Sequence, residues 1–226
     1  VGIHVYLRRF GGDTEARRIR ELLANRLFNL FQKNATEEWP WHTDVVTWGS
    51  ARLPHALLLS GQWMQRGDMF EMGLRTLDWL TRIQTSPEGH FSPVGNDGWY
   101  PRGGEKARFD QQAIEAYATL EACVEAFDAT RDERWLEEAR KAFEWYLGYN
   151  DLGIPIYDYT TGGCRDGLQP DGVNPNQGAE STLSWLLSLL AMYALGSREE
   201  LVRAAQAILY GVDDHTRTAD RDGKIL

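Results

Sequence analysis

Three carboxylates stand where apolar helices are predicted to begin, and they are the residues of this chain most suited to acid–base chemistry. Asp44, Asp110 and Glu180 each precede a run of apolar or small residues. A carboxylic acid and a carboxylate on either side of a glycosidic bond can act as general acid and general base. We therefore expect Glu180 to be the general acid and Asp110 or Asp44 to be the base.

The same carboxylates also have structural interpretations, which stay open. Asp44 and Asp110 occupy positions at which an Asp commonly caps a helix N-terminus. Glu180 is not needed as a cap, because the segment 174–177, Asn-Pro-Asn-Gln, matches a capping box one turn earlier. A carboxylate just before an apolar run needs either an arginine partner or a raised pKa, and the second would suit a general acid.

Three long segments contain or lead up to these carboxylates, at residues 37–61, 88–109 and 151–174. Each combines aromatic rings with carboxylate, amide or guanidinium groups. Sugars present hydroxyls to such polar groups and flat C–H faces to aromatic rings, so this mixture favours a saccharide over an apolar metabolite. The side chains expected to bind it are Trp41, His42, Trp48, His90, Asp97, Trp99, Tyr100, Arg102, Arg108, Gln112, Tyr157, Arg165, Asp166, Asn176 and Gln177.

Composition and charge argue against several other partners. The 226 residues include 24 Lys and Arg against 33 Asp and Glu, a net charge of −9, and no basic run is present to follow a phosphate backbone. We therefore expect no nucleic-acid partner. The most apolar segment, Leu183–Leu195, is shorter than the roughly 20 residues that cross a bilayer, so no membrane span is expected.

Cysteines and histidines give no sign of a metal or a cofactor. Cys123 and Cys164 form neither a disulfide framework nor a CxxC metal pair, so we expect both to be reduced and the protein to be cytoplasmic. His42, His55 and His90 lack close metal-ligand spacing, so no metal site and no cofactor are predicted. His42 and His90 stay candidates for binding hydroxyls or moving protons.

Helical periodicity predicts an all-α fold with about seven helices in an inner and an outer layer. Helices that begin near residues 44, 110 and 178 are apolar almost all round and are expected inside, whereas those near 68, 133 and 198 are amphipathic and are expected outside. The predicted helices are Asp13–Lys33, Asp44–Met64, Asp68–Thr85, Asp110–Ala129, Glu133–Tyr149, Pro175–Leu195 and Arg198–Tyr210.

The spacing of the elements indicates a repeat of helix pairs. Asp44, Asp110 and Glu180 are separated by 66 and 70 residues, and each interval contains one inner and one outer helix. Connections within a pair are short and those between pairs are long, so the three inner helices run in one direction and the long loops gather at one end. The predicted architecture is an α/α-hairpin toroid or partial toroid, with the candidate site at the loop end.

Residues 1–226 are predicted to form a single domain with a polar tail at 211–226. Because the chain begins at Val1 without a Met or a targeting pattern, we expect it to be part of a longer natural chain. A partial ring would leave an apolar edge open, which would point either to a homodimer through that edge or to a truncated chain.

A resemblance to a known family is carried by the segments WPWHTDVVTWGSARLPHALLLSG, GHFSPVGNDGWYPRGGEKARFDQQAIEA and LGYNDLGIPIYDYTTGGCRDGLQPDGVNPNQGAEST. They resemble the all-helical domain that follows the glycosyltransferase part of some bacterial sugar transferases, a relative of the six-hairpin glycosidase superfamily. The resemblance covers most of Thr14–Tyr193. It implies a carbohydrate context and a glycosyltransferase domain upstream in the same chain, and it assigns no catalytic residue.

Three functions compete on these observations. The first is a carbohydrate-active domain with glycoside hydrolase-like acid–base chemistry on a glycosidic bond. The second is a non-catalytic glycan-binding or accessory domain of a glycosyltransferase, which predicts sugar binding without turnover. It is favoured because a closed ring of six helix pairs needs twelve helices and only about seven are predicted. A sugar epimerase is the weakest of the three.

Overall fold

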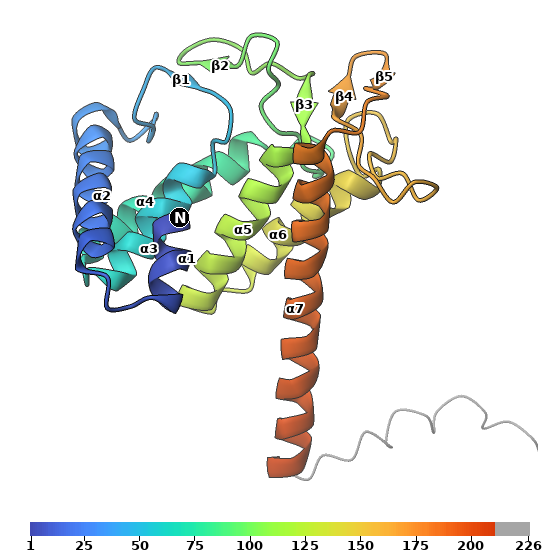
Figure 1. Cartoon of the computed structure of the whole chain (residues 1–226). Coiled ribbons are helices and arrows are strands. Elements are labelled where there is room, and N and C mark those ends of the chain that lie inside the picture. Colours follow the sequence, from blue (N-terminus) through green and yellow to red (C-terminus); the bar gives the residue numbers. More distant parts are fainter. Residues whose placement is uncertain (211–226) are drawn as a thin grey trace, which may run out of the picture. The chain divides into compact units, whose positions relative to one another are not determined.

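The computed structural model describes residues 1–210, and these contain seven α-helices (Figure 1). The chain forms two compact units, residues 1–188 and 189–226. The prediction of an all-α fold is confirmed. The helices are α1 (Gly2–Arg9), α2 (Thr14–Asn34), α3 (Arg52–Trp63), α4 (Gly67–Ile83), α5 (Ala113–Thr130), α6 (Arg134–Glu144) and α7 (Ala179–Tyr210), with a short 3-10 helix η1 at Trp145–Leu147.

Two helix pairs form the framework of the first unit, α3 with α4 and α5 with α6. A residue in the left-handed conformation reverses the chain within each pair, Gln65 with φ 54° and Arg131 with φ 60°. The first pair is closely packed, since a Cβ on Gly61 would lie 2.6 Å from the backbone nitrogen of Phe70. The sequence spacing predicts both pairs.

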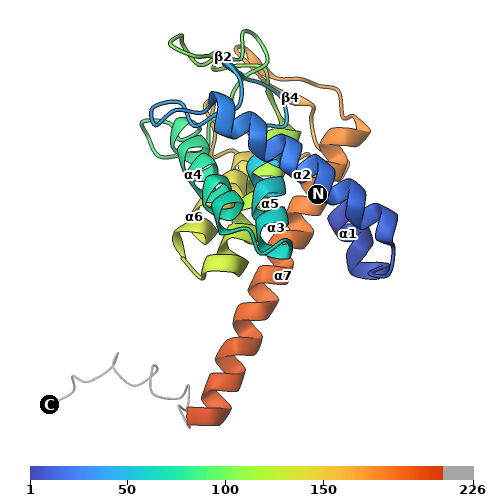
Figure 2. The same ribbon diagram turned by 90° about the vertical axis from the view of Figure 1, so that its left-hand side faces the viewer.

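The inner and outer helices of these pairs differ in burial as predicted. α5 buries residues on several faces, including Ala116, Ala118 and Leu120, whereas α6 buries a single stripe that includes Trp135 and Ala139. The two inner helices, α3 and α5, lie side by side, and α2 packs beside α3 (Figure 2). The inner layer thus places the N-termini of α3 and α5 next to each other.

The third predicted pair, Pro175–Leu195 with Arg198–Tyr210, is wrong. The chain instead forms one continuous helix, α7, through Gly196 and Ser197. Nothing reverses the chain there, because Gly196 has no positive φ and no proline follows it. A single glycine inside a helix costs only about 1 kcal/mol, which a long helix tolerates. The helix that completes the seven is α1, which the periodicity does not predict.

Within the first unit, the start of α7 turns its leucines outward. Ser181, Ser184 and Trp185 are buried, whereas Leu183 and Leu187 are exposed. The prediction of an inner helix buried all round is therefore wrong for this segment, whose buried stripe consists largely of serine. The exposed leucines leave an apolar edge, and a homodimer through that edge stays a prediction.

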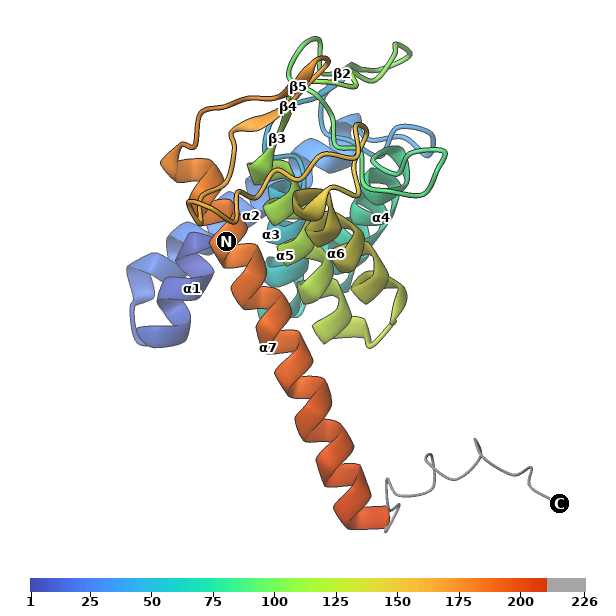
Figure 3. The same cartoon turned by 90° about the vertical axis from the view of Figure 1, so that its right-hand side faces the viewer.

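Short antiparallel strands join the three long loops at one end of the helices (Figures 1 and 3). The first loop carries β1 (Val45–Val46), which pairs with β2 of the second loop (Tyr100–Pro101). The second loop also carries β3 (Gln111–Gln112), which pairs with β4 of the third loop (Gly167–Gln169), and β4 pairs with β5 (Gly172–Val173). The prediction that the loops gather at one end is confirmed.

None of the helices within residues 1–210 is long and apolar enough to cross a membrane. The predicted polar tail at 211–226 lies outside the described residues. The prediction of a single domain stays a prediction.

Candidate functional site

The first loop holds one tryptophan in the core and another in solvent. The Trp41 ring is 2% exposed, its Nε1 donates to the Val45 carbonyl at 3.1 Å, and Phe31 and Trp79 lie against it. The predicted stacking role of Trp41 is therefore wrong, because a sugar cannot reach the ring. Trp48 is 51% exposed and stays a candidate platform.

A buried carboxylate from α5 holds the backbone next to Trp48. Glu115 is 1% exposed, and its oxygens accept hydrogen bonds from Gly49 N, from Ser50 N at 3.3 Å and from Ser50 Oγ at 3.0 Å. Burial raises the pKa of Glu115 to about 7, although the hydrogen bonds and the charge of Arg52 lower it. The sequence prediction missed this residue, because α5 carries several acids and nothing in the sequence marks Glu115 as the buried one.

Asp44 lies in a loop and not at a helix start. α3 begins at Arg52, so the interpretation of Asp44 as a helix cap is wrong. Its carbonyl accepts a 2.7 Å hydrogen bond from Arg102 N, and its carboxylate lies 3.7 Å from Arg102 Nη1. Arg102 also donates to Thr36 Oγ1 at 3.1 Å. Because the Asp44 side chain is 86% exposed, water screens this contact between the first and second loops.

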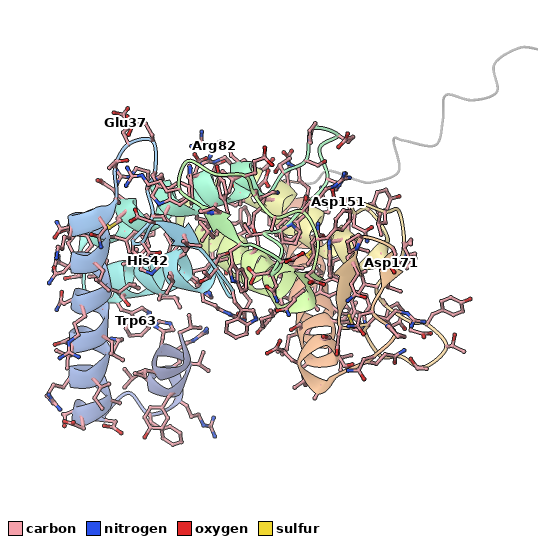
Figure 4. All side chains as sticks on the ribbon, turned by 90° about the horizontal axis from the view of Figure 1, so that it is seen from above. Glu37, His42, Trp63, Arg82, Asp151 and Asp171 are labelled. Atoms are coloured by element: carbon pink, nitrogen blue, oxygen red, sulfur yellow. The ribbon has the colours of Figure 1, made fainter. Side chains whose placement is uncertain are left out.

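The other predicted residues of the first two loops are accessible to different degrees. His42 is half-buried against the Phe31 ring, burial lowers its pKa, and its Nδ1 has no hydrogen-bond partner in the described part of the chain. Trp99 and Tyr100 are half-buried, and Asp97 is exposed. In the view onto the loop end, His42 lies on the side of α2 (Figure 4).

Asp110 precedes α5 without capping it. The helix begins at Ala113, and Asp110 has a left-handed backbone with φ 57° whose carbonyl accepts a hydrogen bond from Asn96 N at 3.1 Å. The cap interpretation of Asp110 is therefore wrong. Gln112 occupies the cap position, and its buried Oε1 accepts no hydrogen bond within residues 1–210.

The second and third loops meet at a buried carboxylate that the sequence prediction missed. The Asp151 side chain is 4% exposed and accepts hydrogen bonds from Gln111 Nε2 at 2.6 Å and from Arg108 Nε at 2.9 Å. Burial would raise the pKa of Asp151, but hydrogen bonds from Ser92, Gln111 and Arg108 outweigh it and hold the pKa below the usual value. Trp145 Nε1 donates to Gln111 Oε1 at 2.7 Å and so ties the cluster to the core.

His90 and Lys106 also lie near this carboxylate. His90 Nε2 lies 3.7 Å from Asp151 Oδ1, and His90 Nδ1 is 3.0 Å from Ser86 Oγ. Lys106 Nζ donates to the Ser92 carbonyl at 2.6 Å, and burial lowers the pKa of Lys106 to about 8, against the attraction of Asp151. The structure thus brings the predicted residues His90 and Arg108 together.

In the third loop, the predicted polar residues bind one another. Asp158 accepts hydrogen bonds from Arg165 Nη2 at 3.1 Å and from Gln177 Nε2 at 3.0 Å. Asp166 accepts hydrogen bonds from Asn176 Nδ2 and from Gly178 N at the start of α7. The loop is therefore fixed by its own polar side chains.

The start of α7 differs from the sequence prediction. The segment 174–177 does not cap it, because the helix begins at Ala179 and Asp166 accepts from the preceding amide. Tyr157 stacks on Trp185 at 4.4 Å, so one of its faces is covered. Glu180 is exposed, which contradicts the expectation of a partly buried carboxylate needing a partner.

The predicted catalytic carboxylates are not joined to one another. Within residues 1–210, no hydrogen bond or ion pair links Asp44, Asp110 and Glu180. No group of three His, Cys, Asp or Glu side chains in this described part could hold a metal ion. The loop end is instead organised by three arginine–carboxylate pairs, Asp44 with Arg102, Asp151 with Arg108 and Asp158 with Arg165.

Comparisons with known proteins find similarity among solved structures. No protein-family model matches the sequence, and no curated protein sequence matches it. Among solved structures, a selenomethionine derivative of a GH76 alpha-mannanase from Bacteroides thetaiotaomicron is similar, with 15% sequence identity and a TM-score of 0.49 over 72% of this chain. The match covers 42% of that structure, so this chain spans less than half its length.

Proposed function

We propose that this chain is a saccharide-binding helical domain that holds its ligand at the loop end without cleaving it. The observation that carries the proposal is the Trp48 indole, 51% exposed beside a turn whose backbone is bonded to the buried Glu115. An exposed aromatic ring suits the C–H face of a sugar ring, and the backbone next to Trp48 is already held before binding, which lowers the conformational freedom lost.

The arginine–carboxylate pairs support a neutral ligand. A guanidinium bound to one carboxylate keeps further N–H donors, so it can still donate to the hydroxyls of a sugar. Arg102 and Arg108 are exposed, while Arg165 is half-buried, and each is held by its own carboxylate. Paired charges of this kind favour hydroxyl recognition over the binding of a strongly charged ligand.

Binding is favoured over hydrolysis by the surroundings of the predicted catalytic residues. A general acid in a glycosidase usually lies in an apolar pocket, where burial keeps it protonated. Glu180 is exposed in the first turn of α7, and Asp44 is exposed beside Arg102. Neither residue has the environment of such an acid.

The test is to incubate the protein with cellotetraose, mannotetraose, xylotetraose and maltotetraose, to measure binding by calorimetry and to search for products by chromatography. We expect at least one of these sugars to bind and none to be shortened. Release of shorter sugars would contradict the proposal and favour the hydrolase.

Glycoside hydrolysis is the second candidate, and one observation favours it. The carboxylates of Asp110 and Glu180 make no hydrogen bond or ion pair with any other residue of the described range, so both are free to act on a ligand. If products are found, Glu180→Gln or Asp110→Asn should abolish their release while leaving the fold intact. An upstream glycosyltransferase domain in the natural chain stays a prediction.

A further inference from the structure

Three carboxylates of α5 reach α3 or the loop that leads into it. Glu121 pairs with Arg52, and Glu125 accepts a 2.8 Å hydrogen bond from Gln62 Nε2. Both of these contacts join one helix to the other. Among the three, Glu115 alone binds the loop ahead of α3, at the end where the long loops gather.

The contact made by Glu115 fixes two consecutive backbone amides. Gly49 has φ +66°, a left-handed conformation that presents its own N–H and that of Ser50 to the same carboxylate. The Ser50 hydroxyl is a third donor. A carboxylate that is 1% exposed would be costly without such donors, so the turn and the carboxylate depend on each other.

Trp48 directly precedes this turn. Its indole is 51% exposed and makes no hydrogen bond or ring contact with any other residue among 1–210, so the adjoining backbone is what limits where the indole can lie. We infer that Glu115 is the positioning residue of the saccharide platform: its carboxylate fixes the Gly49–Ser50 turn and thereby orients the Trp48 ring. This inference rests on the proposed function.

The chain supplies a matched control for the test. Glu121→Gln removes a carboxylate from the same helix and weakens a contact to α3, but it leaves the Gly49–Ser50 turn untouched. Glu115→Gln turns an amide N–H group toward donors that need an acceptor. Ser50→Ala removes the hydroxyl donor and keeps both backbone amides.

The first measurement is deuterium exchange at the amides of Gly49 and Ser50. We expect exchange about tenfold faster in Glu115→Gln than in the wild-type protein, and unchanged exchange in Glu121→Gln. The second is the affinity for whichever of the four tetraoses binds, which should fall about tenfold in Glu115→Gln and stay unchanged in Glu121→Gln.

A pH profile separates positioning from a general loss of structure. A protonated carboxyl group is a poorer acceptor, so the wild-type affinity should weaken below about pH 7, with the neighbouring Arg52 charged throughout. The affinity of Glu115→Gln should lack this step. If Glu115→Gln does not fold, two measurements still test the inference. The wild-type affinity should weaken below about pH 7, and Ser50→Ala should lose less than tenfold in affinity; absence of both effects would overturn the inference.

The outcomes distinguish this inference from the proposed function. If no sugar binds while the Gly49 and Ser50 amides exchange faster in Glu115→Gln, the proposed function is overturned. If a sugar binds and Glu115→Gln keeps wild-type exchange and affinity, the positioning role of Glu115 is overturned alone.

Discussion

The side-chain amide of Gln111 donates a 2.6 Å hydrogen bond to Asp151, and this contact fixes the second long loop to the third. The other end of the same amide accepts a 2.7 Å hydrogen bond from Trp145, whose ring is buried. The two loops are thus anchored to the helical core and not only to each other. The loop end is accordingly a preformed surface.

Asp151→Asn should destabilise the protein by about 2 to 3 kcal/mol, because it turns an amide group toward the donors of Gln111 and Arg108. The pKa of Asp151 is lowered in the folded protein, so its contribution is present above the unfolded pKa and is lost as the pH falls through the folded value. Urea unfolding at neutral and acidic pH measures both effects. Asp171→Asn is the control, since that residue is an exposed aspartate of the same loop (Figure 4) and should change stability by less than about 0.5 kcal/mol.

Glu115 should give the opposite pH dependence. Its pKa is raised from 4.5 to about 7 in the folded protein, so its contribution is fullest below the unfolded pKa and is lost as the pH rises through the folded pKa. Between about pH 4 and about pH 8, the wild-type protein should therefore lose about 2 to 4 kcal/mol more of its unfolding free energy than Glu115→Gln does. A difference that is constant across this range would contradict the assignment.

His55 also contributes to the pH dependence of wild-type stability, so Glu115 has to be tested by comparing the wild type with Glu115→Gln. Burial lowers the pKa of His55 to about 3, with Arg52 acting in the same direction, so its contribution to stability is full above the unfolded pKa and falls on acidification. The effects of His55 and Glu115 overlap with opposite sign between about pH 4.5 and about pH 6.5. The pH dependence of wild-type stability alone would mix them.

Gly61→Ala should separate α3 from α4. The added Cβ would lie 2.6 Å from the backbone nitrogen of Phe70, which cannot move without shifting α4, so we expect a loss of about 1 to 3 kcal/mol in urea unfolding. The matched change is Gly67→Ala at the first residue of α4, where nothing lies within 4 Å of the added atom. Equal stabilities of the two variants would contradict the close crossing of this pair.

Gly196→Ala tests whether α7 is continuous. An alanine inside an uninterrupted helix should raise the helix content, measured by circular dichroism, and stabilise the helix by up to about 1 kcal/mol. Nothing lies within 4 Å of the added Cβ. A reduced helix content would instead favour the chain reversal that the sequence spacing suggests.

Much of the fold follows from local pattern. The pairs α3–α4 and α5–α6 are predicted because apolar and amphipathic helices alternate across short connections, and the left-handed residues Gln65 and Arg131 make those reversals. The same reasoning fails for α7. Gly196 resembles a turn residue in sequence, but in the structure it adopts a helical backbone inside α7. A local pattern cannot decide between these outcomes when the cost of a helical glycine is small.

The site is less predictable because tertiary contacts decide which side chains are free. Trp41 and Trp48 belong to one loop with similar composition, yet Phe31 and Trp79, from two different helices, bury Trp41. A tertiary contact also sets the start of α7, because Asp166, from an earlier part of the third loop, accepts a hydrogen bond from the amide of Gly178 just before the helix. Such partners are distant in sequence and give no periodic signal.

Replacing Trp48 is the most direct test of whether the loop end is a saccharide site. Calorimetric titration of wild type, Trp48→Ala and Trp63→Ala with the four tetraoses compares two tryptophans of similar exposure, 51% and 53%, of which Trp63 lies at the other end of α3. We expect one sugar to bind the wild-type protein and Trp63→Ala equally, and to bind Trp48→Ala at least about tenfold more weakly. Unchanged affinity in Trp48→Ala, or binding by none of the sugars, would contradict the claim that the loop end is a saccharide site.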